Sequence, residues 1–129
     1  MTDTLVAQID RDASSLDGAQ IAGYLRQQLG GRVAAHLAGL DDSEQIRRWA
    51  SGNQVPAVAG EHDLRLREGY KVTRTLVESY DAQTAKAWLF GSNADLGDAA
   101  PIELIAAAGR AEDLREVRQA ARRFASQGW

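Results

Sequence analysis

Apolar residues recur every three or four positions along almost the whole chain, and no stretch alternates cleanly between apolar and polar residues. This spacing places apolar side chains on one face of a helix, so the sequence predicts an all-α fold. In the first half the pattern predicts apolar helix faces over residues 5–9, 21–29, 33–38 and 46–50. Gly30, Gly39 and Gly52 follow three of these segments, where a helix is expected to end.

The second half of the chain predicts one longer helix and several short ones. Residues 52–60 contain Pro56 and no periodic apolar pattern, so we expect a loop there. Beyond the loop, the pattern predicts helices over residues 61–80, 85–89, 101–109 and 114–124. Gly69 weakens the longest of these helices by about 1 kcal/mol relative to alanine. The expected organisation is a first region over residues 1–60 and a second region over residues 61–129.

Polar residues at the expected helix starts support these boundaries. Asp17 and Asp81 each precede a predicted helix, where a carboxylate accepts hydrogen bonds from unpaired backbone N–H groups. Asp41 stands three residues before Glu44, which is the spacing of a capping box. Pro101 suits the first turn of a helix because it lacks an N–H group.

The composition is that of a globular chain the size of one domain, with 129 residues, 14.0 kDa, 44% hydrophobic residues and 26% charged residues. No apolar run reaches the roughly 20 residues that a membrane-spanning helix needs, and no signal-peptide pattern is present. The chain contains no cysteine, which excludes disulfides, thiolate metal ligands and cysteine nucleophiles. We therefore expect a cytoplasmic protein that does not contact membranes.

The distribution of charge limits any nucleic-acid contact to a small area. The net charge is −3, which is unsuited to a polyanion-binding surface over the whole molecule. Within residues 21–60, however, four arginines against three acidic residues leave a net charge of +1. Arginine is the side chain suited to bidentate contacts with phosphate and guanine. A coding bias toward arginine and alanine explains the same counts.

Residues that would support catalysis are scarce. The sequence has no nucleophile elbow, no P-loop and no dinucleotide-binding glycine pattern. His36 and His62 are far apart in sequence, and the adjacent residues Glu61, His62 and Asp63 do not face one another on a helix. The sequence therefore predicts neither an enzyme nor a metal site, and we expect no cofactor.

Residues 31–52 show the spacing of a helix-turn-helix. Ala35 is small enough for two helices to cross closely, Gly39 allows the turn, and Ile46 and Trp49 anchor the second helix. The other side of that helix is polar. We expect DNA contacts from Arg32, Ser43, Gln45, Arg47, Arg48, Ser51 and Asn53, with Arg65 as a further phosphate contact.

The C-terminal third contains a second ordered set of residues. Trp88 and Leu89 are followed by Asn93 and Leu96, then by Pro101 with an aliphatic helix, and last by a glycine at position 109. An amphipathic helix with several arginines closes the chain. Packing in a hydrophobic core is sufficient to explain these apolar residues.

The order of the two patterns resembles a known family. Ala35, Gly39, Ile46, Trp49 and the glycine at position 52 resemble the pattern of Xre-type repressors. The C-terminal set resembles the toxin-binding domain of the Xre/MbcA/ParS antitoxin family, which carries a Trp-Leu pair, an Asn, a Leu, a Pro with an aliphatic helix and a late Gly. The resemblance covers the chain from about residue 17 to its C-terminus.

The resemblance implies an Xre-like helix-turn-helix followed by a small helical toxin-binding module. Such a protein would form a homodimer, repress its own promoter DNA and neutralise a RES-type toxin that consumes NAD. Its C-terminal region would cover the active site of this cognate toxin. The toxin contacts implied here are Trp88, Asn93, Arg122, Arg123, Phe124, Gln127 and Trp129.

Alternatives stay open at this point. Trp129 either anchors an interface or folds back on its own core. The chain is alternatively a stand-alone helix-turn-helix repressor, or a protein–protein adaptor that does not bind DNA.

Overall fold

The computed structural model describes residues 2–127, and this part of the chain is helical without any strand. The all-α prediction is therefore confirmed. The elements are α1 (Asp3–Ser15), α2 (Gly18–Leu29), α3 (Gly31–Leu37), α4 (Ser43–Ala50), α5 (Glu61–Ser79), α6 (Ala82–Phe90), η1 (Ala94–Leu96), α7 (Pro101–Ala107), η2 (Ala111–Leu114) and α8 (Arg115–Gln127). A single antiparallel bridge joins Asn93 and Ala99 within the described residues.

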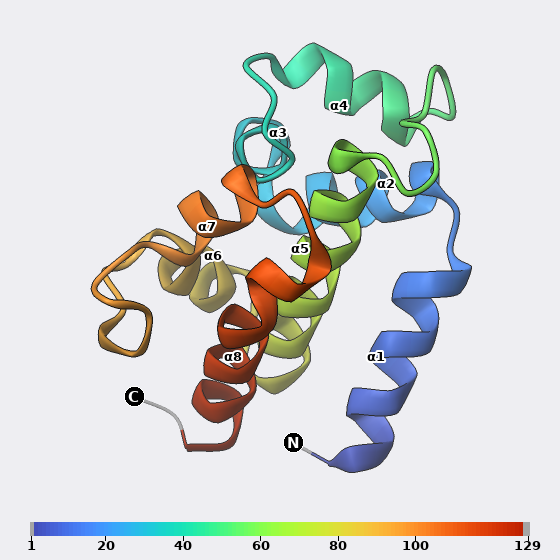
Figure 1. Ribbon diagram of the computed structural model, residues 1–129. Coiled ribbons are helices and arrows are strands. Elements are labelled where there is room, and N and C mark those ends of the chain that lie inside the picture. The colour runs from blue at the N-terminus through green and yellow to red at the C-terminus, as the bar shows by residue number, and fades with distance from the viewer. Residues whose placement is uncertain (1, 128–129) are drawn as a thin grey trace.

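The long helix α5 runs through the middle of the fold and contacts α1, α2, α3, α6, α7 and α8 (Figure 1). Leu66, Tyr70 and Leu76 of this helix are buried in the hydrophobic core. The core is one cluster that takes side chains from both predicted regions, from Ile9 on α1 to Ala121 on α8. Burial of these apolar side chains is what holds the short helices in place, because helices of 7–13 residues are marginal in isolation.

Gly69 has a packing role that the sequence pattern did not indicate. A Cβ atom at this position would overlap the side chain of Leu37, which is fully buried at the end of α3. The absence of a side chain therefore lets α3 approach α5 closely. Glycine lowers the helix propensity at this position, but only a residue without a side chain allows this contact.

Two of the three predicted N-caps are confirmed. The Asp17 carboxylate accepts a hydrogen bond from the Gln20 backbone N–H at 2.8 Å, and the Asp17 backbone N–H donates one to Gln20 Oε1 at 3.0 Å. Asp81 accepts from the Thr84 amide at 2.7 Å. The resulting capping box at Asp17 and the cap at Asp81 set the starts of α2 and α6.

The prediction of a capping box at Asp41 is wrong. The cap of α4 is Asp42, whose carboxylate accepts a hydrogen bond from the Glu44 N–H at 2.8 Å. The helix begins at Ser43, so the residue just before it has the extended backbone that a cap needs. Asp41 lies one position too early and is exposed.

The N-terminal helix α1 is attached to α5 by arginines as well as by its apolar face. The Arg67 guanidinium donates to the carbonyl oxygens of Ala13 and Leu16 at 2.8 and 2.7 Å, which satisfies the end of α1. Arg74, about two turns further along α5, pairs with Asp12. These contacts fix the angle between the two helices, with α1 along one side of α5 (Figure 1).

The C-terminal helix α8 packs on α5 through a buried ion pair. Glu68 is 3% exposed, and its carboxylate pairs with Arg118 of α8 and, at 2.8 Å, with Lys71. The same terminal nitrogen of Arg118 also donates to the Ala111 carbonyl at 3.0 Å. In the described part of the chain, no helix has the length and apolar character to cross a membrane.

Candidate functional sites at opposite ends of the fold

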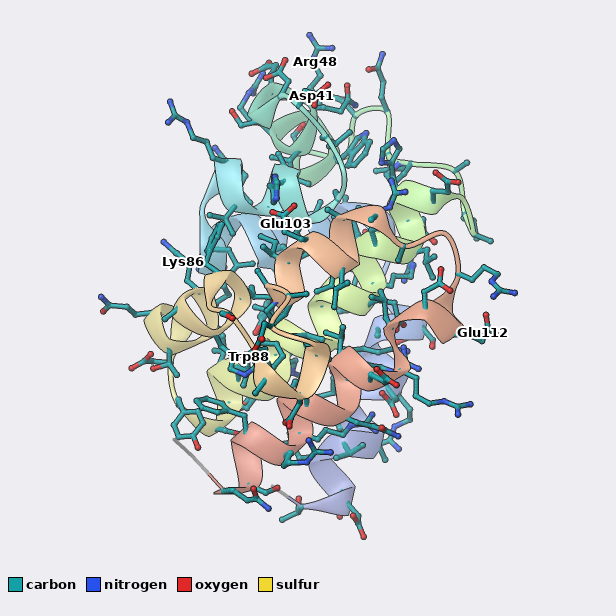
Figure 2. All side chains as sticks on the ribbon, turned by 60° about the vertical axis from the view of Figure 1, so that its left-hand side comes forward. Asp41, Arg48, Lys86, Trp88, Glu103 and Glu112 are labelled. Carbon is teal, nitrogen blue, oxygen red and sulfur yellow. The ribbon has the colours of Figure 1, made fainter. Side chains whose placement is uncertain are left out.

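The residues that the sequence singles out gather at two ends of the molecule. Helix α4 lies at one end, and the last turns of α8 lie at the other (Figure 1). Figure 2, turned about the vertical axis, keeps the same arrangement, with Arg48 at the α4 end and Trp88 well below it. The two groups of residues therefore form separate surfaces.

Helices α3 and α4 are joined by a tight turn that depends on Gly39. This residue has a φ of +80°, and a Cβ there would lie 3.1 Å from the Ala106 carbonyl oxygen and would overlap the guanidinium of Arg65. Ile46 and Trp49 of α4 are buried, and α4 packs on both α2 and α3. The predicted anchors thus point inward; that this helix pair binds DNA stays a prediction.

We call the exposed side of α4 with the residues just after it the α4 surface. It carries Ser43, Arg47, Arg48, Ser51 and Asn53, all exposed, while Gln45 is half-buried. Arg47, Arg48 and Asn53 line one open hollow together with Gln54. Arg32 and Ser43 instead line a second hollow, which also contains Asp41 and Asp42. The predicted DNA contacts are therefore divided between a basic end and an acidic end of α4.

Glu44 binds the two arginines of the α4 surface. Its carboxylate accepts a hydrogen bond from Arg47 Nε at 3.0 Å and a second one from another nitrogen of the same guanidinium. Arg48 Nε lies 3.7 Å from Oε1 of the same carboxylate. The hydrogen bond from Arg47 holds the pKa of Glu44 below its usual value, so the carboxylate is charged at neutral pH.

Ser51 and Asn53 complete the C-terminal end of α4. Ser51 Oγ donates to the Arg48 carbonyl at 2.8 Å, and Asn53 Nδ2 donates to Ser51 Oγ at 3.4 Å. Both side chains satisfy local groups where the helix ends. Their part in stabilising the helix end explains their presence without a ligand, and contact with phosphate stays a prediction.

The expectation for Arg65 is wrong. Its side chain is 12% exposed, and its Nε donates to the Ala108 carbonyl at 2.9 Å, at the end of α7. A second nitrogen pairs with Glu61 at 3.2 Å, one turn earlier on α5. Arg65 therefore joins α5 to α7 below Gly39, and it does not belong to the α4 surface. Glu61 stands four residues before Arg65 in the sequence, and this spacing was compatible with an ion pair on one helix face.

Most of the predicted toxin contacts line one open hollow beside the C-terminal half of α8. We call this the α8 hollow, and its lining residues are Trp88, Ser92, Asn93, Ala94, Asp95, Ala120, Arg123, Phe124 and Gln127. Arg123 pairs with Asp95 across the hollow at 2.6 Å. Trp88 is 6% exposed, so it forms the base rather than the rim.

Aromatic side chains support the wall of the α8 hollow. The ring centroid of Phe124 lies 6.4 Å from that of Trp88 and 5.3 Å from that of Tyr80. Tyr80 Oη also donates to the Phe124 carbonyl at 2.9 Å, which ties the end of α5 to α8. The sequence pattern placed Tyr80 on a helix face but gave no signal for its contact with α8, which is 44 residues away.

Asn93 shapes the loop that borders the α8 hollow. Its side chain accepts a hydrogen bond from the Asp95 amide at 3.0 Å and so begins η1. Its backbone N–H donates to the Ala99 carbonyl at 3.2 Å. The asparagine thus holds Asp95 near Arg123, and this positioning accounts for the residue type.

One of the predicted toxin contacts lies on another side of α8. Arg122 points toward α1, where its guanidinium lies 3.5 Å from the carboxylate of Asp10. It lies on the other side of α8 because successive helix residues are rotated by about 100°. Arg123 therefore lines the α8 hollow and Arg122 does not. Trp129 lies outside the described residues.

The two histidines have structural partners. His36 pairs with Glu103 at 2.6 Å between α3 and α7, and His62 Nδ1 lies 2.8 Å from the Ala38 carbonyl. The His62 ring also lies 5.6 Å from that of Trp49. Within residues 2–127, no group of three or more histidine, aspartate or glutamate side chains is placed to hold a metal ion.

Comparison of the chain with protein-family models, with curated proteins and with solved structures found no match.

Proposed function

We propose that this protein is an antitoxin of a type II toxin–antitoxin pair. It neutralises a RES-type, NAD-consuming toxin by covering the active site, and it represses its own promoter through DNA binding. The observation that carries this proposal is the α8 hollow. Five residues chosen for toxin contact from two separate segments of sequence, residues 88–93 and 123–127, line a single open surface.

The α8 hollow has features of a protein-binding surface. It combines aromatic side chains from Trp88 and Phe124 with the charged pair of Arg123 and Asp95 at the rim. Aromatic residues and arginine are the side chains that most often dominate binding energy in interfaces. A toxin bound there would leave the α4 surface free, because the two surfaces are at opposite ends of the molecule (Figure 1).

The α4 surface supports the second half of the proposal. Arg47, Arg48 and Asn53 line one open hollow at the end of a short exposed helix, and these side chains commonly contact phosphates and base edges. A homodimer in the cytoplasm would present two such helices to paired half-sites on the promoter. The chain itself needs no cofactor for either activity.

The pairing of Glu44 with both arginines favours a second candidate function. A carboxylate that satisfies Arg47 and Arg48 reduces their attraction for phosphate. In that case the protein is an adaptor that binds a protein partner without DNA. A duplex-binding titration at low salt separates the two candidates, because only the antitoxin–repressor binds its own upstream DNA.

The experiment that tests the proposal is co-expression of the chain with the product of its neighbouring open reading frame. The neighbour alone should deplete cellular NAD and arrest growth, and the wild-type chain should restore both. Phe124→Ala and Arg123→Ala should restore less, because both side chains line the α8 hollow. A harmless neighbour would refute the toxin half, and a stand-alone repressor would then be the account to test.

Arg122→Ala is the matched control for this experiment. It removes the same side chain from the adjacent position of α8, but Arg122 faces Asp10 and not the hollow. We expect Arg122→Ala to protect cells as well as the wild-type chain does. Equal loss of protection in the Arg122 and Arg123 variants would contradict the assignment of the surface.

A further inference from the structure

The three charged residues of the α4 surface form one unit. Glu44 precedes Arg47 by three residues and Arg48 by four, so all three side chains lie on neighbouring positions of the helix. The carboxylate makes two hydrogen bonds to Arg47 and lies 3.7 Å from Arg48 Nε. A single acidic side chain thus contacts both of the arginines that line the hollow with Asn53.

The neighbouring acidic residues do not share this position. The Asp42 carboxylate is occupied by the Glu44 N–H as the helix cap. Asp41 is exposed before the helix, at the acidic end that also contains Arg32, and it makes no ion pair with Arg47 or Arg48 among the described residues. Glu44 is therefore the acidic residue of this surface that competes directly for the guanidinium groups.

A phosphate that binds the Nε edge of the Arg47 guanidinium must replace the carboxylate of Glu44. The carboxylate already takes Nε and one terminal nitrogen, so a phosphate at this edge competes for the same donors. A phosphate at the other edge meets a guanidinium whose charge is already partly balanced. The unit of Glu44 and two arginines also has a net charge of +1 instead of +2, which lowers long-range attraction for a polyanion.

We propose that Glu44 limits the affinity of the α4 surface for DNA by competing with phosphate for Arg47 and Arg48. This inference rests on the proposed DNA-binding function. Non-specific duplex offers only phosphates, so it replaces the carboxylate poorly. A specific site adds base contacts that offset the loss of the internal pair. Because the internal pair must break for either duplex, Glu44 lowers the affinity for both, and base contacts become necessary for tight binding.

The test compares Glu44→Gln with Asp41→Asn. Both variants remove one negative charge near the α4 surface, but only the first removes the carboxylate that binds the arginines. The glutamine oxygen of the first variant can still accept a hydrogen bond from arginine. Glu44→Ala removes this acceptor as well and serves as a second variant. Thermal melting of each variant checks that the fold is retained, since the cap from Asp42 uses the backbone of residue 44.

Binding is measured with a duplex from the chain's own upstream region and with an unrelated duplex, over a series of salt concentrations. Glu44→Gln should bind the unrelated duplex at least about fivefold more tightly at low salt, and its log–log salt slope should steepen by about 0.9 for each arginine released to phosphate. Asp41→Asn should change binding by less than about twofold.

The outcomes separate this inference from the function on which it rests. If wild type and Glu44→Gln bind each of the two duplexes with the same affinity and the same salt slope, DNA binding stands and the role of Glu44 is wrong. An equal gain in Asp41→Asn would also overturn the inference, because it would show a general charge effect. If no variant binds the upstream duplex, the proposed DNA-binding function itself is wrong, and the inference is overturned with it.

Discussion

Substitution of Gly69 by alanine tests the close contact that seats α3 on α5. In an exposed helix the change from glycine to alanine stabilises by about 1 kcal/mol through helix propensity. Here the added methyl group would overlap three carbon atoms of the Leu37 side chain, which is fully buried and cannot turn into solvent. Overpacking of a filled core costs about 1–3 kcal/mol. The net expectation is a loss of up to about 2 kcal/mol in the free energy of unfolding.

Gly23 provides the matched control for this substitution. It also lies inside a helix, α2, but a Cβ atom there would have no neighbour within 4 Å. Gly23→Ala should therefore stabilise the protein by about 0.5–1 kcal/mol. The two variants should move the free energy of unfolding in opposite directions.

The assay is urea unfolding followed by far-ultraviolet circular dichroism, with thermal melting as a second measure. For a chain of this size, 1 kcal/mol corresponds to a shift in Tm of about 3–5 °C. A Gly69→Ala variant as stable as Gly23→Ala would refute the reasoning, because it would show that α3 and α5 are not in close contact at Leu37.

Three further predictions concern polar groups in and around α5. Thr73→Val should raise the free energy of unfolding by about 1 kcal/mol in urea melts, because the Thr73 hydroxyl is buried without a hydrogen-bond partner among the described residues; a loss of stability would contradict this. Arg67→Ala should cost about 2–3 kcal/mol because it leaves the carbonyls at the end of α1 unpaired. Arg11→Ala, which removes an exposed hydrogen bond to Gln8 and a solvent-screened attraction to Asp12, should change stability by less than about 0.5 kcal/mol. The hydrogen bond from Arg74 lowers the pKa of Asp12 below its ordinary 3.8. The pair therefore stabilises the fold at neutral pH, and this stabilisation is lost as the pH falls from 3.8 through the lowered folded-state pKa. Melting temperatures measured over a series of acidic pH values should show this loss in wild type and a smaller loss in Asp12→Asn.

The sequence was sufficient to predict where along the chain most helices lie. The loop over residues 52–60 and the long helix after it were predicted because a proline and a missing apolar pattern mark one segment and a regular pattern marks the next. The caps at Asp17 and Asp81 follow from local chemistry, since the carboxylate bonds an amide three residues away. The error at Asp41 is a shift of one residue, because Asp41 and Asp42 are both able to cap a helix.

Contacts between distant residues could not be predicted in this way. Arg65 was assigned to phosphate because a helical arginine near a candidate DNA surface has the right charge, but the carbonyl of Ala108 that it binds is 43 residues away. The pairing of Arg122 with Asp10 likewise depends on where α1 packs; the local pattern of α8 shows only that Arg122 and Arg123 point in different directions. The packing role of Gly69 also becomes evident only from the position of the Leu37 side chain.

The measurement that tests the central claim most directly is the dissociation constant between this protein and the product of its neighbouring open reading frame, determined by calorimetry for wild type, Arg123→Ala and Arg122→Ala. If the partner binds the α8 hollow, Arg123→Ala should weaken binding by about tenfold or more, as loss of an interface arginine commonly does. Arg122→Ala should bind as the wild-type protein does, because its side chain faces α1. Equal dissociation constants for all three proteins, or no binding by any of them, would contradict the claim.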